Sequence, residues 1–345
     1  MIRVQNIYYM LSYAYRVLNE DSYAMLDIEK FEYASDLFAA ILNKGISNQI
    51  RRGMGKEYIA NTDMLRSPVG KINVSSSVKN RTIQKKQLVC EFDEFSENAY
   101  INRILKSTII QLIRCSDVTL DQKRALKRIL LYFSNVDVIE PHKILWSGIK
   151  YHKNNATYKM LINVCYLVIK GMLQSENDGL YKLSRYVDDQ RMHRLYEHFI
   201  LEYYKKHYPQ FSISAGIINW NVDDGVSELL PLMKTDIMIE YKGKTVIIDA
   251  KYYQQMLQSN DLFNSHTIRS GNLYQIYAYV KNYDISSSGN VTGVLLYAQT
   301  NEEIMLDKEY NIGGNRISIK SLNLNTDFLQ ICSQLDLLVQ RFLLD

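Results

Sequence analysis

The sequence predicts a two-domain α/β protein, and three observations lead to this prediction. The chain has 345 residues, which corresponds to about two domains at roughly 150 residues each. Several segments repeat apolar residues at the three- and four-residue spacing of an amphipathic helix. One stretch of the second half instead contains two short β-like segments on either side of Lys242-Gly243. A chain of this length can bury a core without a disulfide framework.

The expected helices are distributed over both halves of the chain. In the first half they span residues 7–19, 36–42, 98–115, 121–133 and 157–173. In the second half, residues 190–206 repeat the i, i+3, i+4, i+7 spacing. Between them lies the polar, glycine-containing segment 175–179, which is expected to separate the domains. The sequence therefore predicts an N-terminal domain over residues 1–180 and a C-terminal domain over residues 181–345.

The segment from about residue 44 to residue 90 differs from the helical parts around it. Its glycines, its proline, a run of three serines and short alternating pieces predict a small β-rich or looping module. From Lys44 to Lys86 ten lysines and arginines stand against two acids, so this stretch carries a net charge of +8 in a chain whose total is +4. Such an excess is typical of a surface that contacts a polyanion or a partner. A solvated basic loop is the alternative.

Composition and missing motifs exclude several classes of protein. The four cysteines form no CxxC pair, which argues against a zinc ribbon or a redox motif and fits reduced thiols in the cytoplasm. No apolar run approaches the roughly 18–20 residues of a membrane span, and the first residues lack the features of a secretory signal. The sequence has no GxxxxGK(S/T), so no nucleotide is expected to bind this chain alone. The six histidines do not cluster as metal ligands would.

Two aspartates are expected to face each other across the hairpin around Lys242-Gly243. A two-residue turn there pairs Tyr241 with Lys244, and continuing that register places Asp236 opposite Asp249. Opposed residues on antiparallel strands have Cβ atoms roughly 4.5–5.5 Å apart, and like charges there are destabilising. A divalent cation removes that repulsion, and carboxylate oxygens suit Mg²⁺ or Mn²⁺. The hairpin therefore predicts a metal site.

Lys251 follows Asp249 by two residues, so both side chains lie on the same face of the strand. The apolar run 246–248 indicates that this strand is buried. A lysine beside the metal can activate an attacking water and stabilise charge on a phosphoryl centre. The pattern predicts a metal-dependent phosphodiesterase site, and the alternative is an exposed ion pair that arises by chance.

Two further features are candidates to support Lys251 and the metal. Gln275 and Tyr279 stand at i and i+4 on an expected helix, where the pair can hold a phosphate or orient Lys251. Glu197 lies beside the apolar stripe of the 190–206 helix and is a candidate third metal ligand. The alternatives are an ordinary amphipathic helix edge and a solvated glutamate.

These residues resemble the PD-(D/E)xK nuclease pattern with its QxxxY extension. The matching positions are Asp236, Asp249-Ala250-Lys251 and Gln275-x-x-x-Tyr279. Thr235 stands where the name of the pattern has proline, and that position varies. Other stretches resemble the McrC family, namely residues 4–14, 92–98, 102–108, 230–236 and 249–253. The resemblance runs nearly from end to end.

The resemblance implies a C-terminal restriction-endonuclease-like domain, with a mixed sheet flanked by helices, after an α+β N-terminal domain that binds a partner. It implies a Mg²⁺-dependent DNA endonuclease subunit of a McrBC-type restriction system directed at 5-methylcytosine. Asp236 and Asp249 would bind the metal and Lys251 would be catalytic. The implied partners are double-stranded modified DNA and a McrB-like AAA+ GTPase hexamer whose hydrolysis the chain stimulates.

In the McrC family the N-terminal half inserts into the pore of the partner's ring. The basic module is the candidate for that contact, and Arg51, Arg52 and Lys56 are its candidate residues. Two other functions stay open, a non-catalytic adaptor of an AAA+ NTPase and an autonomous repair-type nuclease. The intact acids argue against the adaptor, and a half-chain without a catalytic signature argues against the autonomous nuclease.

Overall fold

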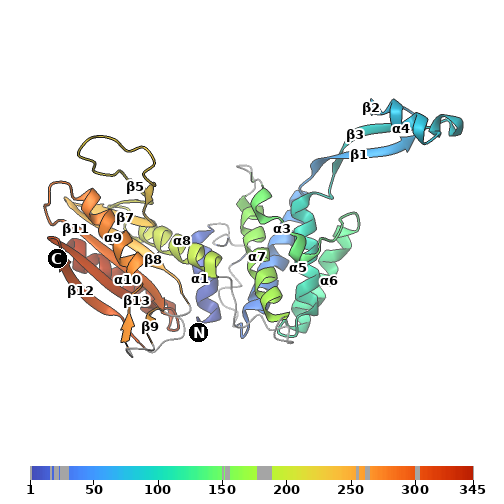
Figure 1. The fold of residues 1–345 in the computed structure, drawn as a ribbon. Coiled ribbons are helices and arrows are strands. Elements are labelled where there is room, and N and C mark those ends of the chain that lie inside the picture. Colours follow the sequence, from blue (N-terminus) through green and yellow to red (C-terminus); the bar gives the residue numbers. More distant parts are fainter. Residues whose placement is uncertain are drawn as a thin grey trace. The chain divides into compact units, whose positions relative to one another are not determined.

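The computed structural model describes residues 2–15, 18, 23, 31–149, 151, 156–176, 189–253, 256–260, 265–299 and 304–344. They form two compact units that differ from the two expected domains (Figure 1). One unit combines residues 1–32 with residues 186–345, and the other contains residues 33–185. The expected boundary segment 175–179 does not begin in a loop, because helix α7 (Ala156–Glu176) includes its first two residues. Residues 177–179 lie outside the described part of the chain.

The N-terminal helix α1 (Val4–Ala14) belongs to the C-terminal unit, which corrects the assignment of residues 1–32 to the N-terminal domain. It packs against α8 (Asp189–His207). The hydroxyl oxygen of Tyr13 lies 2.7 Å from Nε2 of His207. Apolar spacing predicted the helix, but it carries no information about which partner covers the apolar face.

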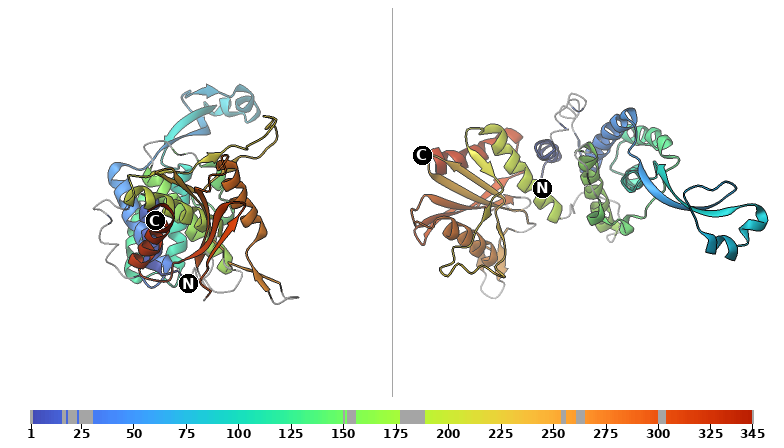
Figure 2. Two further views of the ribbon diagram at one scale, coloured as in Figure 1. Left: turned by 90° about the vertical axis from the view of Figure 1, so that its left-hand side faces the viewer. Right: turned by 90° about the horizontal axis from the view of Figure 1, so that it is seen from above.

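The C-terminal unit is built on a six-stranded mixed sheet with the order β12-β13-β11-β8-β7-β4. Its strands are β4 (Ser212–Ser214), β7 (Ile237–Tyr241), β8 (Lys244–Lys251), β11 (Val291–Gln299), β12 (Asp307–Ile312) and β13 (Asn315–Asn323). β11 runs parallel to both β8 and β13, and the other neighbours are antiparallel. Helix α9 (Ser270–Tyr283) covers one face, whereas α8 and α10 (Phe328–Val339) cover the other (Figure 2). This confirms the expected mixed sheet flanked by helices.

Shorter elements complete this unit. They are β5 (Ile217–Ile218), which pairs with β6 (Met233–Lys234), β9 (Gln258–Asn260), which pairs with β10 (Ser265–Thr267), and the π-helix η7 (Gln340–Leu344). Within the described ranges of both units, no helix has the length and apolar character needed to cross a membrane.

The turn between β7 and β8 fixes the register of the two strands. Lys242, with φ +47°, and Gly243, with φ +81°, both adopt left-handed conformations, as the central residues of a type I′ turn do. Tyr241 therefore pairs with Lys244, which is the register expected from the sequence. β8 is buried along nearly its whole length, as a central strand covered on both faces should be.

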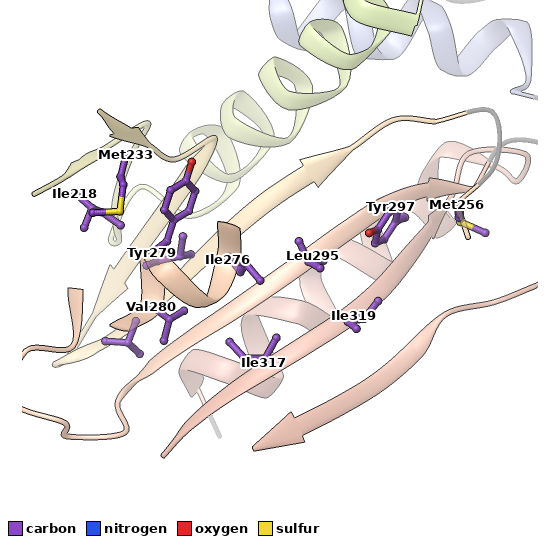
Figure 3. Close-up of a cluster of buried hydrophobic side chains, with 12 residues drawn as sticks. Ile218, Met233, Met256, Ile276, Tyr279, Val280, Leu295, Tyr297, Ile317 and Ile319 are labelled. Carbon is purple, nitrogen blue, oxygen red and sulfur yellow. The ribbon is translucent and has the colours of Figure 1, made fainter. Parts of the chain in front are cut away.

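A hydrophobic core fills the space between the sheet and α9 (Figure 3). Its members include Leu295 and Tyr297 of β11, Ile317 and Ile319 of β13, and Ile276 and Val280 of α9. A Cβ atom on Gly293 would lie 2.8 Å from side-chain atoms of Ile276 and Val280. The glycine thus permits a close approach of α9 to the sheet, which fixes the helix that carries Gln275 and Tyr279.

The unit of residues 33–185 contains a group of helices and a small sheet that extends away from them (Figure 1). The longer helices are α3 (Ala34–Arg52), α5 (Tyr100–Arg114), α6 (Leu120–Leu130) and α7. The sheet is antiparallel, with the order β1-β3-β2, and consists of β1 (Glu57–Leu65), β2 (Lys71–Ile72) and β3 (Leu88–Ser96). Short helices are α4 (Val74–Lys79), η3 (Thr82–Lys85), η4 (Leu131–Phe133), η5 (Pro141–Lys143) and η6 (Trp146–Gly148). Residues 44–52 of the basic module belong to α3, and its remainder combines β1, β2 and the start of β3 with the short helices α4 and η3.

Asp284 is a buried carboxylate that closes the loop between α9 and β11. It accepts hydrogen bonds from the backbone and hydroxyl of Ser288, from the backbone of Gly289 and from the amide of Asn315, at 2.7–2.9 Å. Burial alone would raise its pKa, but the hydrogen bonds from Asn315, Ser288 and Gly289 outweigh burial and hold the pKa of Asp284 well below its usual range. The ionised form therefore ties α9 to the start of β13.

Replacing Asp284 by asparagine is expected to lower the free energy of unfolding by about 1–3 kcal/mol at neutral pH, because buried donors lose a charged acceptor. The folded-state pKa is below the unfolded value of about 3.9, so the stabilisation is complete above that value and is lost as the pH falls toward the folded pKa. Urea denaturation of the two proteins at several pH values measures the difference. Asp223→Asn, at an exposed position, is the control. An equal difference at pH values well above and well below about 3.9 would contradict the account.

Candidate active site

The candidate site lies on β8 and at the start of β7. Asp249 and Lys251 are on β8 with exposed fractions of 1% and 7%. Asp236 directly precedes β7, and one of its carboxylate oxygens, Oδ2, accepts a hydrogen bond from the backbone N–H of Ala250 at 2.9 Å. The pairing of Ile237 with Ile248 leaves Asp236 and Asp249 as the next positions of the same register. The structure thus brings the two aspartates and the lysine together.

The site holds negative charge in a buried setting. Burial, and then the charges of Asp249 and Glu197, raise the pKa of Asp236 to about 7. Burial also raises the pKa of Asp249, although the neighbouring Lys251 ammonium opposes this. Burial disfavours that ammonium, but the adjacent carboxylates outweigh it and raise the pKa of Lys251. The lysine therefore balances one carboxylate, and a further cation would be needed for both aspartates to be ionised together at neutral pH.

A chain of hydrogen bonds from α9 holds Lys251. Its Nζ donates to Oε1 of Gln275 at 3.1 Å, and Nε2 of Gln275 donates to the hydroxyl of Tyr279 at 2.8 Å. That hydroxyl donates in turn to the carbonyl of Lys234 at 3.0 Å. Gln275 and Tyr279 had two expected roles, holding a phosphate or orienting Lys251. These contacts favour the second, because the polar atoms of the pair already have protein partners.

Glu197 approaches the aspartates from α8, and a histidine accompanies it. Oε1 of Glu197 lies 2.7 Å from Nε2 of His193, and Nδ1 of His193 accepts from the backbone N–H of Tyr252 at 3.2 Å. His193 was not predicted as a site residue, because the six histidines of the sequence form no cluster. The signal was present as a His-x-x-x-Glu spacing, since residues four apart share one side of a helix.

The two aspartates fit a hard divalent cation. Oδ2 of Asp249 is buried and lies 2.8 Å from Nζ of Lys251 as an ion pair, without a hydrogen bond of good geometry. Mg²⁺ commonly binds through one or two carboxylates and keeps several waters, so the opposed pair supplies a suitable donor set. Within the described ranges no three His, Cys, Asp or Glu side chains are grouped to hold a metal. Glu197 therefore lies near the pair without completing a three-ligand group.

The candidate partner-binding residues lie in the other unit. Arg51 and Arg52 form the exposed last turn of α3. Lys56 is paired with Glu97 at 3.2 Å, so its charge is partly balanced. The adjoining sheet exposes apolar side chains that were not predicted as site residues, among them Tyr58 and Phe95, whose ring centroids are 5.0 Å apart. The basic module is thus an exposed surface of mixed apolar and cationic character.

Known proteins resemble this chain over most of its length. A restriction enzyme of Escherichia coli strain K12, the type IV methyl-directed restriction enzyme EcoKMcrBC, is 28% identical over 95% of this chain and 94% of its own. A solved half-complex of Thermococcus gammatolerans McrB AAA+ hexamers with bound McrC matches with a TM-score of 0.51 and 17% identity. That match covers 98% of this chain and 75% of the other, and at this identity it supports the fold alone.

A family model gives the most direct assignment. The model described as "McrBC 5-methylcytosine restriction system component" matches residues 3–298. The matched segment includes α1, the basic module, both aspartates, Lys251, Gln275 and Tyr279. The chain therefore belongs to the family of McrBC 5-methylcytosine restriction system components.

Proposed function

We propose that this protein is the Mg²⁺-dependent DNA endonuclease subunit of a modification-dependent, McrBC-type restriction system. One observation carries the proposal, the partly buried Asp236 beside the buried Asp249 and Lys251 at the end of a strand covered on both faces. The order of these residues, and α9 with Gln275 and Tyr279, support a PD-(D/E)xK nuclease layout of the C-terminal unit. A bacterial relative named as a methyl-directed restriction enzyme supports modified DNA as the substrate.

The proposed partner is a McrB-like AAA+ GTPase hexamer. The solved structure that shares this fold is a complex of McrB AAA+ hexamers with bound McrC. This sequence has no GxxxxGK(S/T) motif, so a motor that hydrolyses nucleotide has to be another chain. The exposed arginines and apolar side chains of the basic module suit the surface of such a partner. In this proposal the chain stimulates hydrolysis by the ring, and the ring drives DNA to the nuclease site.

Each residue of the site has a distinct role in the proposed reaction. Asp236 and Asp249 would hold Mg²⁺, which supplies Lewis-acid stabilisation of the phosphodiester group when bound. Lys251 lies 2.8 Å from the Asp249 carboxylate. Its ammonium would donate a hydrogen bond to a phosphoryl oxygen. Gln275 holds this ammonium in place, and Tyr279 fixes the amide of Gln275.

Replacing Asp249 by alanine is expected to reduce cleavage by at least about 100-fold, because loss of a metal ligand removes several kcal/mol of transition-state stabilisation. The chain should still fold, since the change also removes repulsion with Asp236. Plasmid cleavage with Mg²⁺ measures the effect, with methylated and unmethylated DNA and with and without the AAA+ partner and GTP. Asp223→Ala, at an exposed position of the same unit, is the control.

Each outcome of that experiment selects one function. Cleavage that requires the partner, GTP, methylation and Asp249 is the expected result. Cleavage by the wild-type chain alone would favour an autonomous nuclease. Stimulated GTP hydrolysis without cleavage in any mixture would favour an adaptor. Wild-type cleavage rates in the Asp249→Ala protein would refute the assignment of the site.

Reversing the charges of Arg51 and Arg52 to glutamate is expected to weaken stimulation of the partner's GTP hydrolysis and to leave Mn²⁺ binding unchanged. The physical reason is loss of two exposed cations at the end of α3, next to the proposed contact surface. Lys127→Glu with Arg128→Glu is a matched control, because these residues are adjacent, exposed and in the last turn of α6. Equal effects of the two double variants on GTP hydrolysis would reject the chosen contact.

A further inference from the structure

His193 connects α8 to the strand that carries the proposed catalytic residues. Its ring lies between the Glu197 carboxylate on the same helix and the backbone of Tyr252, which directly follows Lys251. We propose that His193 is a positioning residue that holds Glu197 beside the Asp236–Asp249 pair. This inference deepens the proposed function and rests on it, since it assigns a role toward the same metal.

The hydrogen-bond donors and acceptors define the tautomer of the ring. A backbone N–H can only donate, so Nδ1 of His193 has to be the acceptor of the 3.2 Å contact with Tyr252. In the neutral imidazole the proton then lies on Nε2. Nε2 is 2.7 Å from Oε1 of Glu197, so the ring donates to the carboxylate. Each nitrogen thus has one defined partner, and the Glu197 side chain is held at one oxygen.

This contact differs from an ordinary helix-surface pair. A His-Glu pair at i and i+4 stabilises a helix only slightly and needs no third partner. Here the second ring nitrogen binds the backbone next to Lys251, so the position of the glutamate is tied to the catalytic strand. His193 and Glu197 are also only about one-quarter exposed, at 28% and 26% of their side chains. Both facts favour a role at the site over a role on the helix surface.

The place of Glu197 suggests what the positioning achieves. Glu197 is among the charges that raise the pKa of Asp236. Glu197 therefore lies within electrostatic reach of that aspartate without forming a three-ligand group in the described ranges. Mg²⁺ keeps several waters when one or two carboxylates bind it. The Glu197 carboxylate can accept a hydrogen bond from such a water. The hydrogen bond from His193 to one oxygen of Glu197 keeps the other oxygen directed toward the metal site.

Two amide substitutions separate the two contacts of the ring. His193→Asn keeps an acceptor near the position of Nδ1 and removes the donor to Glu197. His193→Gln places an amide near the position of Nε2 and retains that donor. Titration of the full-length chain with Mn²⁺ by calorimetry is expected to show about tenfold weaker binding for His193→Asn, the size of effect typical of residues that orient metal ligands. The affinity of His193→Gln should stay close to that of the wild type.

A separate experiment tests whether His193 acts on metal binding through Glu197. Glu197→Gln should weaken Mn²⁺ binding about as much as His193→Asn, and combining the two substitutions should add nothing further. This arm keeps the proposal testable if His193→Asn does not fold, as judged by circular dichroism. His198→Asn, the same substitution at an exposed histidine of α8, is the control and should leave the affinity unchanged.

Asp249→Asn distinguishes failure of this inference from failure of the proposed function. If the wild type binds Mn²⁺ and Asp249→Asn does not, the metal pair is present, and an unchanged affinity of His193→Asn would overturn the inference alone. Additive losses in the double variant would also overturn it, because His193 would then act independently of Glu197. If the wild type binds no Mn²⁺, or Asp249→Asn binds it equally well, the proposed function fails and this inference fails with it.

Discussion

The opposition of two carboxylates at the end of the β7–β8 hairpin is the constraint on which the rest of the site depends. The two-residue turn at Lys242-Gly243 sets the register, and the register places Asp236 next to Asp249. Burial of this pair, complete at Asp249 and partial at Asp236, makes the shared negative charge costly. Lys251 offsets part of it with one ammonium, and α9 holds that ammonium through Gln275. A divalent cation is the natural complement of what remains.

Much of this arrangement could be predicted from the sequence, because it depends on patterns between residues that are close along the chain. A glycine at the turn and the alternation of a strand suffice to place Asp236, Asp249 and Lys251 relative to one another. The i, i+4 spacing of Gln275 and Tyr279 likewise predicts that both residues lie on the same side of a helix. The mixed sheet itself was expected only through resemblance to a known family. The parallel neighbour of β8 is β11, whose paired residues lie more than 40 residues further along the chain.

What the sequence did not disclose depends on contacts between distant segments. Helix α1 was predicted as a helix, but its packing against α8 requires knowledge of two surfaces at once, so residues 1–32 were assigned to the wrong unit. His193 was overlooked because its partner on the strand, the backbone N–H of Tyr252, carries no sequence signal. The exposed Tyr58 and Phe95 belong to paired strands whose register sets their proximity. Local patterns therefore predict elements and short-range geometry, whereas the assembly of the elements decides the remainder.

The most direct test of the account is to locate the metal. Crystals of the full-length chain grown with Mn²⁺ would be measured at wavelengths on either side of the manganese absorption edge. The account predicts an anomalous peak bound by carboxylate oxygens of both Asp236 and Asp249 at about 2.1–2.2 Å, close to the distances of octahedral oxygen-bound cations. Saturating Mn²⁺ without a peak between these two side chains, or with a peak bound elsewhere, would contradict it.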